Sequence, residues 1–204
     1  MDFERLIARV KNILVTPKTE WPVIAAEPAS SASIYLNYAM ILAAIGPVAT
    51  FVGMTIFGMS LPLVGTIKVP LTTGILQMII GYVLSLGMLY VMALLIDALA
   101  PSFGGEKNFV QALKTVAYGY TAAWILAVLN IVPLLGMLAL IGSIYSIYLI
   151  YVGLPSTMKC PPEKAGGYTA VVVLIGIVLS VCVGFVLAIA SGTNAAMQAA
   201  MQGG

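Results

Sequence analysis

The sequence predicts an all-α integral membrane protein: a bundle of five transmembrane helices preceded by an N-terminal amphipathic helix at the membrane interface. Three features support this prediction, namely long apolar runs, very low charge, and basic residues confined to alternate gaps between the runs. Of the 204 residues, 61% are hydrophobic and 8% are charged, whereas soluble domains carry about 25% charged residues. A soluble protein of this size cannot bury so many apolar side chains in one core.

Five apolar runs of about 20 residues or more are the expected membrane spans. At a rise of about 1.5 Å per residue, a helix of this length crosses the hydrocarbon core, which is about 30 Å thick. The runs must be helical because the bilayer supplies no water to pair with backbone N–H and C=O groups. The expected spans cover residues 33–57, 71–97, 109–130, 134–154 and 168–190. They form one membrane domain, 33–190, followed by a short external tail, 191–204.

The segment before the first span, residues 1–32, is expected to be an amphipathic helix and a connector. Apolar residues from Phe3 to Leu14 recur at helical spacing, and basic residues occupy the opposite face. The helix is expected to end before Pro17. It lies either on the lipid surface or on the bundle, and the sequence leaves both open. Beyond it we expect an irregular connector containing Pro22 and an interfacial Trp21.

Orientation follows from the basic residues. Eight of the nine lie on one side of the membrane if the N-terminus is cytoplasmic, and Lys68 is the exception. Lys and Arg in short loops resist translocation, which is the positive-inside rule. We therefore expect a cytoplasmic N-terminus and an external or periplasmic C-terminus in the cell (inner) membrane. The eight residues are Arg5, Arg9, Lys11, Lys18, Lys107, Lys114, Lys159 and Lys164.

The inventory of reactive residues argues against an enzyme. The chain has no histidine, which is the commonest general base and metal ligand. Its two cysteines, Cys160 in a cytoplasmic loop and Cys182 in the middle of a span, are not expected to form a disulfide. No nucleophile elbow, phosphate-binding loop or carboxylate pair is present. We expect no catalytic residue, no metal, no cofactor and no nucleic-acid partner.

Polar residues next to or inside the spans are the candidate binding residues, because such groups are costly in lipid. Asp97 and Lys114 flank the same cytoplasmic turn, where they are expected either to form an interfacial ion pair or to belong to a ligand site. The aromatic and amide candidates either pack inside the bundle, with their hydroxyls bonded to neighbouring helices, or line a polar cavity. These candidates are Tyr118, Tyr120, Asn130, Tyr145 and Tyr148.

Small residues recur every four positions along the fifth span, at Gly176, Ser180, Gly184 and Ala188. This spacing lets helix backbones approach closely. The stripe is expected to pack within the bundle or, alternatively, to form the seam of a homo-oligomer.

Several segments resemble the Yip (Ypt-interacting protein) domain family. They are Tyr118-Gly-Tyr-Thr121 followed by Pro133, the turn from Asp97 to Lys114, the stretch Ile144–Pro155, and Pro17–Trp21. The resemblance implies a five-span membrane fold with a cytoplasmic N-terminus. Eukaryotic members carry an Asp-Leu-Tyr-Gly-Pro motif and bind prenylated Rab-type GTPases. This chain has Pro-Lys-Thr-Glu-Trp-Pro instead, so that role is not transferred, and it resembles a compact prokaryotic-type member.

The expected function is that of a non-enzymatic scaffold that organises the membrane and contacts lipids, or a protein partner, at its cytoplasmic face. The contact surface comprises the N-terminal helix, the Asp97 to Lys114 turn and the Lys159 to Lys164 loop. The alternative is a small permease or channel whose polar-aromatic cavity is lined by Tyr118, Asn130, Tyr145 and Tyr148.

Overall fold

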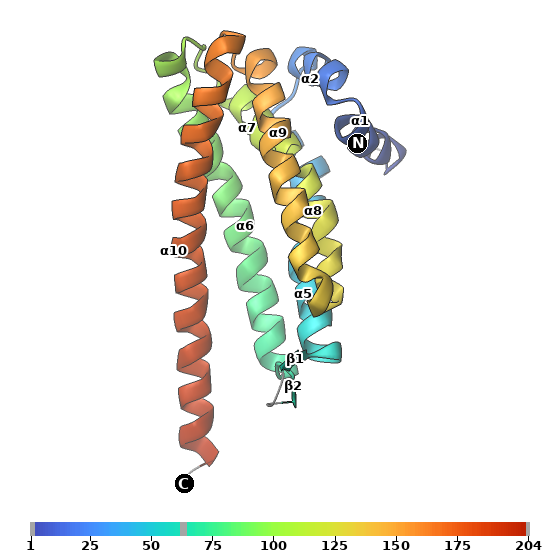
Figure 1. Ribbon diagram of the computed structural model, residues 1–204, viewed down its shortest axis with the longest axis vertical. Coiled ribbons are helices and arrows are strands. Elements are labelled where there is room, and N and C mark those ends of the chain that lie inside the picture. Colours follow the sequence, from blue (N-terminus) through green and yellow to red (C-terminus); the bar gives the residue numbers. More distant parts are fainter. Residues whose placement is uncertain (1–2, 62–64, 203–204) are drawn as a thin grey trace.

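The computed structural model describes residues 3–61 and 65–202, with side chains described outside 59–67 and 186–202. Within these residues, five helical segments are long and apolar enough to cross a membrane. Helices α1 (Phe3–Val15) and α2 (Pro17–Ala26) lie at one end of the bundle, the cap end, and the short strands β1 and β2 lie at the other, the hairpin end (Figure 1). The protein is an all-α, multi-pass membrane protein.

Some span boundaries differ from those expected. The second span runs on through η3 (Ala100–Phe103) because Pro101 sits in the first turn of that helix, where proline is tolerated. The fourth passes Pro155, which lies inside α9 (Ala139–Thr157) rather than ending the span. The five segments are Ser31–Phe57, Leu71–Phe103, Phe109–Ile131, Pro133–Thr157 and Pro162–Phe185.

The first span is not a uniform helix. Pro47 lacks a backbone N–H, and its ring conflicts with the carbonyl four residues earlier, so the chain makes a turn at Ala44. Two π-helical turns also interrupt the α-helical path. Its pieces are α3 (Ser31–Ile34), η1 (Tyr35–Ala39), α4 (Met40–Ala43), α5 (Ile45–Val52) and η2 (Gly53–Phe57).

A short β-hairpin connects the first span to the second. Strand β1 (Met59–Leu61) pairs antiparallel with β2 (Gly65–Ile67), with Ser60 opposite Thr66. Gly58 has φ 76°, a conformation that residues with a side chain rarely adopt. This glycine therefore lets the chain leave the helix and enter the first strand.

The third and fourth spans form an antiparallel helical hairpin. The third comprises α7 (Phe109–Gly119), α8 (Thr121–Leu126) and η4 (Ala127–Ile131), and the fourth comprises η5 (Pro133–Leu138) and α9. A Cβ atom at Gly119 would lie 2.5 Å from Ile150 Cγ1, and one at Gly142 would lie 2.6 Å from the Ala122 carbonyl oxygen. Only glycine permits helices to come this close.

The remaining long helices are α6 (Leu71–Leu99) and α10 (Pro162–Gln202). With 41 residues, α10 is about 60 Å long at 1.5 Å per residue. The residues after 190, expected as an external tail, continue this helix as far as Gln202. Figure 1 shows α10 extending past the hairpin end of the bundle.

The buried core lies mainly toward the cap end. Every residue from Ala112 to Gly119 of α7 is buried, so α7 is the central helix of this half. Partners from other elements contribute large, fully buried side chains: Trp21, Tyr38, Leu89, Leu149, Leu154 and Tyr168. The α1–α2 cap, residues 3–26, is thus part of the folded bundle.

Candidate functional site

The apolar side chains of α1, the first helix of the cap, divide between a buried side and an exposed side. Leu6 and Ile13 are buried against the bundle, with exposed fractions of 5% and 0%, whereas Phe3 and Ile7 are 72% and 52% exposed. One side therefore packs on protein and the other faces outward, beside the exposed Lys11. Of the two expected positions of this helix, the structure shows packing on the bundle, with Phe3 and Ile7 left exposed.

Trp21 fixes the second helix of the cap to the bundle. The sequence predicted an interfacial tryptophan, but the indole is fully buried. A Cβ atom at Gly153 would lie 2.6 Å from the Trp21 ring, so the missing side chain at 153 provides the space for the indole. The expected irregular connector is also wrong: it is helix α2, with Pro22 inside it.

Lys114 caps the end of α2 instead of pairing with Asp97. The Lys114 side chain is 2% exposed, and its Nζ donates hydrogen bonds to the carbonyl oxygens of Ile24 at 2.8 Å and Glu27 at 2.6 Å. These belong to the terminal carbonyls that a helix leaves unpaired, where a cation is favoured by the helix dipole. The expected Asp97–Lys114 pair is absent from the ion pairs of the described residues.

Asp97 lies close to the cap end of α6 and is half-buried. Its Oδ1 atom is buried and has no hydrogen-bond partner within the described part of the chain. The neighbouring carbonyl, that of Ile96, accepts a hydrogen bond from the Tyr168 hydroxyl. Tyr168 stacks on Phe103 with ring centroids 4.7 Å apart. Asp97 therefore borders an aromatic contact between α6, η3 and α10, away from Lys114.

A second cation, Arg9, joins the two helices of the cap. Its guanidinium donates to the carboxylates of Glu20 and Glu27, and its Cζ atom lies 5.9 Å from the centre of the Tyr118 ring. Burial of the guanidinium disfavours its charge, but the hydrogen bond and the charge of Glu27 outweigh this effect and raise the pKa of Arg9. Arg9 thus links α1, α2 and α7 electrostatically.

Tyrosines extend this network into the bundle. Tyr118 packs against Tyr38 with ring centroids 4.4 Å apart, and the Tyr38 hydroxyl lies 2.6 Å from Thr121 Oγ1. The Tyr145 hydroxyl donates to the carbonyl oxygen of Leu14, at the end of α1, at 2.8 Å. This bond satisfies a helix-terminal carbonyl of α1, as Lys114 does for α2.

The other binding residues expected from the sequence lie in different parts of the bundle. Tyr120 lies edge-on to Trp124 in a crevice between α6, α8, α9 and α10, and Tyr148 is 38% exposed. The Asn130 side chain lies near Gly136, at the hairpin end. None of the five principal hollows in the described part of the chain is lined by Tyr118, Asn130, Tyr145 and Tyr148 together. The geometry gives no support to the cavity expected for a permease.

The small-residue stripe of α10 faces the bundle but is loosely packed. A Cβ atom at Gly176 would lie 3.4 Å from the Met92 methyl group, whereas one at Gly184 would meet no atom within 4 Å. The Ser180 hydroxyl donates to the Gly176 carbonyl oxygen in its own helix. The side chain of Ala188 lies outside the described residues. Gly176 therefore packs within the bundle, and space opens beside α10 beyond it.

A polar hollow of about 500 Å³ lies at the cap end, between α2, the start of α7 and the end of α9. Asn108 caps α7 by accepting from the Gln111 backbone N–H, and the Gln111 amide donates to the Ala25 carbonyl oxygen. Lys159 and Glu106 form an ion pair of 2.7 Å at its rim. The hollow offers hydrogen-bonding groups but no cluster of His, Cys, Asp and Glu able to hold a metal among the described residues.

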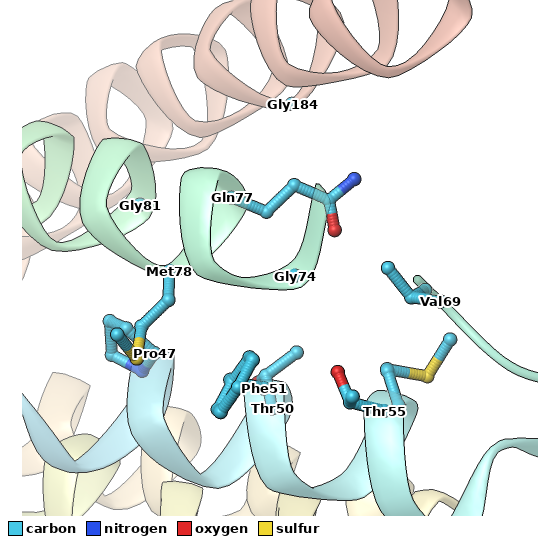
Figure 2. A pocket seen from close by; sticks show the side chains of 11 residues that line it. Pro47, Thr50, Phe51, Thr55, Val69, Gly74, Gln77, Met78, Gly81 and Gly184 are labelled. Carbon is cyan, nitrogen blue, oxygen red and sulfur yellow. The ribbon is translucent and has the colours of Figure 1, made fainter. Parts of the chain in front are cut away.

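A second hollow of about 500 Å³ lies between α5 and α6, toward the hairpin end. Figure 2 shows Met78 reaching from α6 toward Pro47 of α5, with Thr55 further along the first span. Thr55 Oγ1 is buried without a hydrogen-bond partner within the described residues. This hollow is mostly apolar and is separate from the cap.

Sequence reasoning missed the central role of Trp21, Gly153 and Arg9. The signal for Arg9 was weak, because its position on the polar face of α1 also suits a solvated charge. Trp21 beside prolines resembled an interfacial anchor, and Gly153 resembled any other small residue of a span. The packing of α2 on α9 brings Trp21 to Gly153, and the packing of α1 beside α2 brings Arg9 to Glu20 and Glu27.

The model of the Yip1 domain family matches residues 11–183. The chain belongs to the Yip1 domain family. The resemblance found in the sequence is thereby confirmed, whereas no curated protein and no solved structure gave a match. In this Yip1-domain protein the matched range includes α2, Lys114 and Gly153, and it excludes residues 3–10 of α1, which contribute Arg9 and the outward-facing Phe3 and Ile7.

Proposed function

We propose that this Yip1-domain protein is a non-enzymatic scaffold that organises the membrane by binding anionic lipid headgroups at its cytoplasmic face. The observation that carries the proposal is the division of α1: Leu6 and Ile13 hold the helix on the bundle, and Phe3 and Ile7 remain exposed beside Lys11. An outward apolar edge next to basic residues suits a helix seated in the headgroup region.

The charges around the cap support an anionic ligand. Lys11, Lys18, Lys107 and Lys164 are exposed at this end, while Arg9 is already neutralised by two glutamates. A basic residue near an anionic surface contributes about 1 kcal/mol of attraction. The exposed lysines are therefore available to headgroups, and Arg9 keeps the structure of the cap.

Exposed tyrosines near the cap end also support a position of α1 among the lipid headgroups. Tyr90, Tyr148 and Tyr151 are between 38% and 47% exposed, and all lie within three turns of the cap end of α6 or α9. Exposed tyrosines are enriched at membrane–water interfaces. When the membrane surface is set at the level of these tyrosines, α1 lies at the depth of the headgroups.

The proposal is tested by lipid capture. The full chain is reconstituted in phosphatidylcholine vesicles that contain a minority of phosphatidylglycerol, extracted in mild detergent, and its retained lipids are quantified by mass spectrometry. We expect the double variant Lys11→Gln, Lys18→Gln to lower the ratio of retained phosphatidylglycerol to phosphatidylcholine several-fold, because both charges face the headgroups.

Lys68→Gln is the matched control, since Lys68 is an exposed lysine at the hairpin end. It should leave the lipid ratio unchanged. An equal loss with Lys68→Gln, or no loss with the double variant, would show that the cap is not the lipid-binding surface. Catalytic turnover by the reconstituted protein would contradict the scaffold role and indicate an enzyme, and solute transport would indicate a permease.

A further inference from the structure

A crevice of about 320 Å³ lies between α6, α8, α9 and α10, inside the membrane-spanning part of the bundle. Its lining is mostly apolar and includes Met88 and Met92 from α6. Ile147 and Ile177, which also line it, are 38% and 55% exposed. The crevice therefore opens sideways between α9 and α10, where the surroundings are lipid.

Among the described residues, three polar donors that line this crevice lack protein acceptors. The Tyr120 hydroxyl, the Trp124 indole N–H and the Ser143 hydroxyl make no hydrogen bond to any described residue. The other three serines of the lining, Ser85, Ser146 and Ser180, are bonded to backbone groups. An unpaired donor is costly in hydrocarbon, so an occupant that supplies an acceptor is favoured.

The depth of these donors is fixed by the contacts of α8 with α9. Gly119, next to Tyr120, packs on Ile150, and the backbone N–H of Ala123 donates to Ser146 Oγ at 3.0 Å. Tyr120 therefore lies level with the stretch of α9 that carries the exposed Tyr148 and Tyr151. Tyrosines of this kind mark the membrane interface, and the ester carbonyls of phospholipids lie just inside it.

We propose that the crevice binds one acyl chain of a membrane phospholipid, with an ester carbonyl accepting hydrogen bonds from Tyr120 and Trp124. The chain enters between α9 and α10 and extends past Gly176, beyond which α10 stands away from its neighbours. Methionines adapt their shape to a mobile apolar chain. A helix, about 10–12 Å in diameter, is too wide for a hollow of this volume.

This inference goes beyond the proposed function and does not rest on it, because the crevice is apolar and distant from the cap lysines. Its test uses vesicles of zwitterionic phosphatidylcholine alone, which carry no net headgroup charge. The probe is a phosphatidylcholine with a photoreactive diazirine on one acyl chain, and cross-linked residues are mapped by mass spectrometry. We expect labels at Met88, Met92 and Trp124 above the level on the outward face of α10.

Two variants test the site separately. Gly176→Leu fills the crevice and should lower crevice labelling at least threefold, whereas Val178→Leu, on the exposed side of α10, should not. Tyr120→Phe removes only the hydroxyl. In wild type, an ether-linked probe that lacks the carbonyl should label several-fold less than the ester probe, and Tyr120→Phe should remove that difference.

Labelling spread evenly over the outward faces of α6 and α10 would overturn the proposal. So would equal labelling by ester and ether probes in wild type, or cross-links that join two copies of the chain through Met88 and Met92. Should Gly176→Leu fail to fold, the comparison of ester and ether probes in wild type and Tyr120→Phe still decides the outcome.

Discussion

Lys114 is buried at the cap end, with the carbonyl oxygens of α2 in place of water. Its Nζ reaches Ile24 at 2.8 Å, Glu27 at 2.6 Å and Ala25 at 3.4 Å. A buried charge is tolerated only where such partners surround it. Lys114 is therefore the residue on which the attachment of α2 to α7 most depends.

We expect Lys114→Met to destabilise the protein by about 1–3 kcal/mol, because buried carbonyls lose their donor. Thermal unfolding in detergent should show a lower midpoint, and hydrogen exchange should locate the loss at the end of α2. Lys107→Met is the control, since Lys107 is exposed. A Lys114→Met protein as stable as wild type would contradict the capping role.

Gly153 leaves the space that Trp21 occupies. A methyl group at this position would lie 2.6 Å from the indole, so Gly153→Ala should displace α2 and cost about 1–3 kcal/mol. In a Trp124→Phe background, the emission of Trp21 should shift to longer wavelength as the ring becomes exposed.

Gly166→Ala is the matched control, because a Cβ atom there meets nothing within 4 Å. Both changes add one methyl group to a helix of the bundle, and the control is expected to be neutral or stabilising. Equal stability of the two variants would mean that α2 adjusts to the methyl group without cost.

At the scale of elements, α1 and α2 act as one unit because Arg9 joins them. Arg9 and Glu20 are nearly buried, with side-chain exposures of 12% and 11%, so salt screens this pair far less than a surface pair. Removing one partner leaves a carboxylate uncompensated. The cap is thus expected to loosen as a whole when Arg9 is lost.

Arg9→Met should make the backbone amides of α1 and α2 exchange with solvent about tenfold faster, since opening of the cap becomes easier. Hydrogen exchange followed by mass spectrometry measures this directly. Lys11→Gln, an exposed position on the same helix, should leave exchange unchanged. Faster exchange confined to α1 would show that Glu20 and Glu27 do not couple the two helices.

At the scale of the whole molecule, five membrane spans are an odd number, so the two ends of the chain lie on opposite sides of the bilayer. Figure 1 places the N-terminal helices and the end of α10 at opposite ends of the bundle. Since basic residues gather at the cap end, we expect that end in the cytoplasm.

Single cysteines test this orientation. In a Cys160→Ala, Cys182→Ala background, Lys11→Cys should react with a membrane-impermeant maleimide only from the cytoplasmic side, and Lys68→Cys only from the outside. Both replaced lysines are exposed. Reaction of both from the same side would contradict the five-span topology, and reaction with the sides exchanged would contradict the orientation alone.

The sequence by itself determined the number of spans and the helical fold, because a bilayer requires long apolar segments with internal hydrogen bonds. It also determined the family, through the motifs around Tyr118 and Pro133. Features that depend only on neighbouring residues were predicted correctly. For example, α1 ends before Pro17, as expected.

Tertiary structure alone decided which polar residues meet. Asp97 and Lys114 flank the same turn in the sequence, yet Lys114 binds carbonyls of Ile24 and Glu27, 90 and 87 positions earlier in the chain. The residues around Trp21 suggested an interfacial anchor. Its indole is instead part of the buried core, because Gly153 leaves space for it. Contacts between distant segments depend on how helices pack, and the periodicity of apolar residues within each helix carries no information about the partner helix.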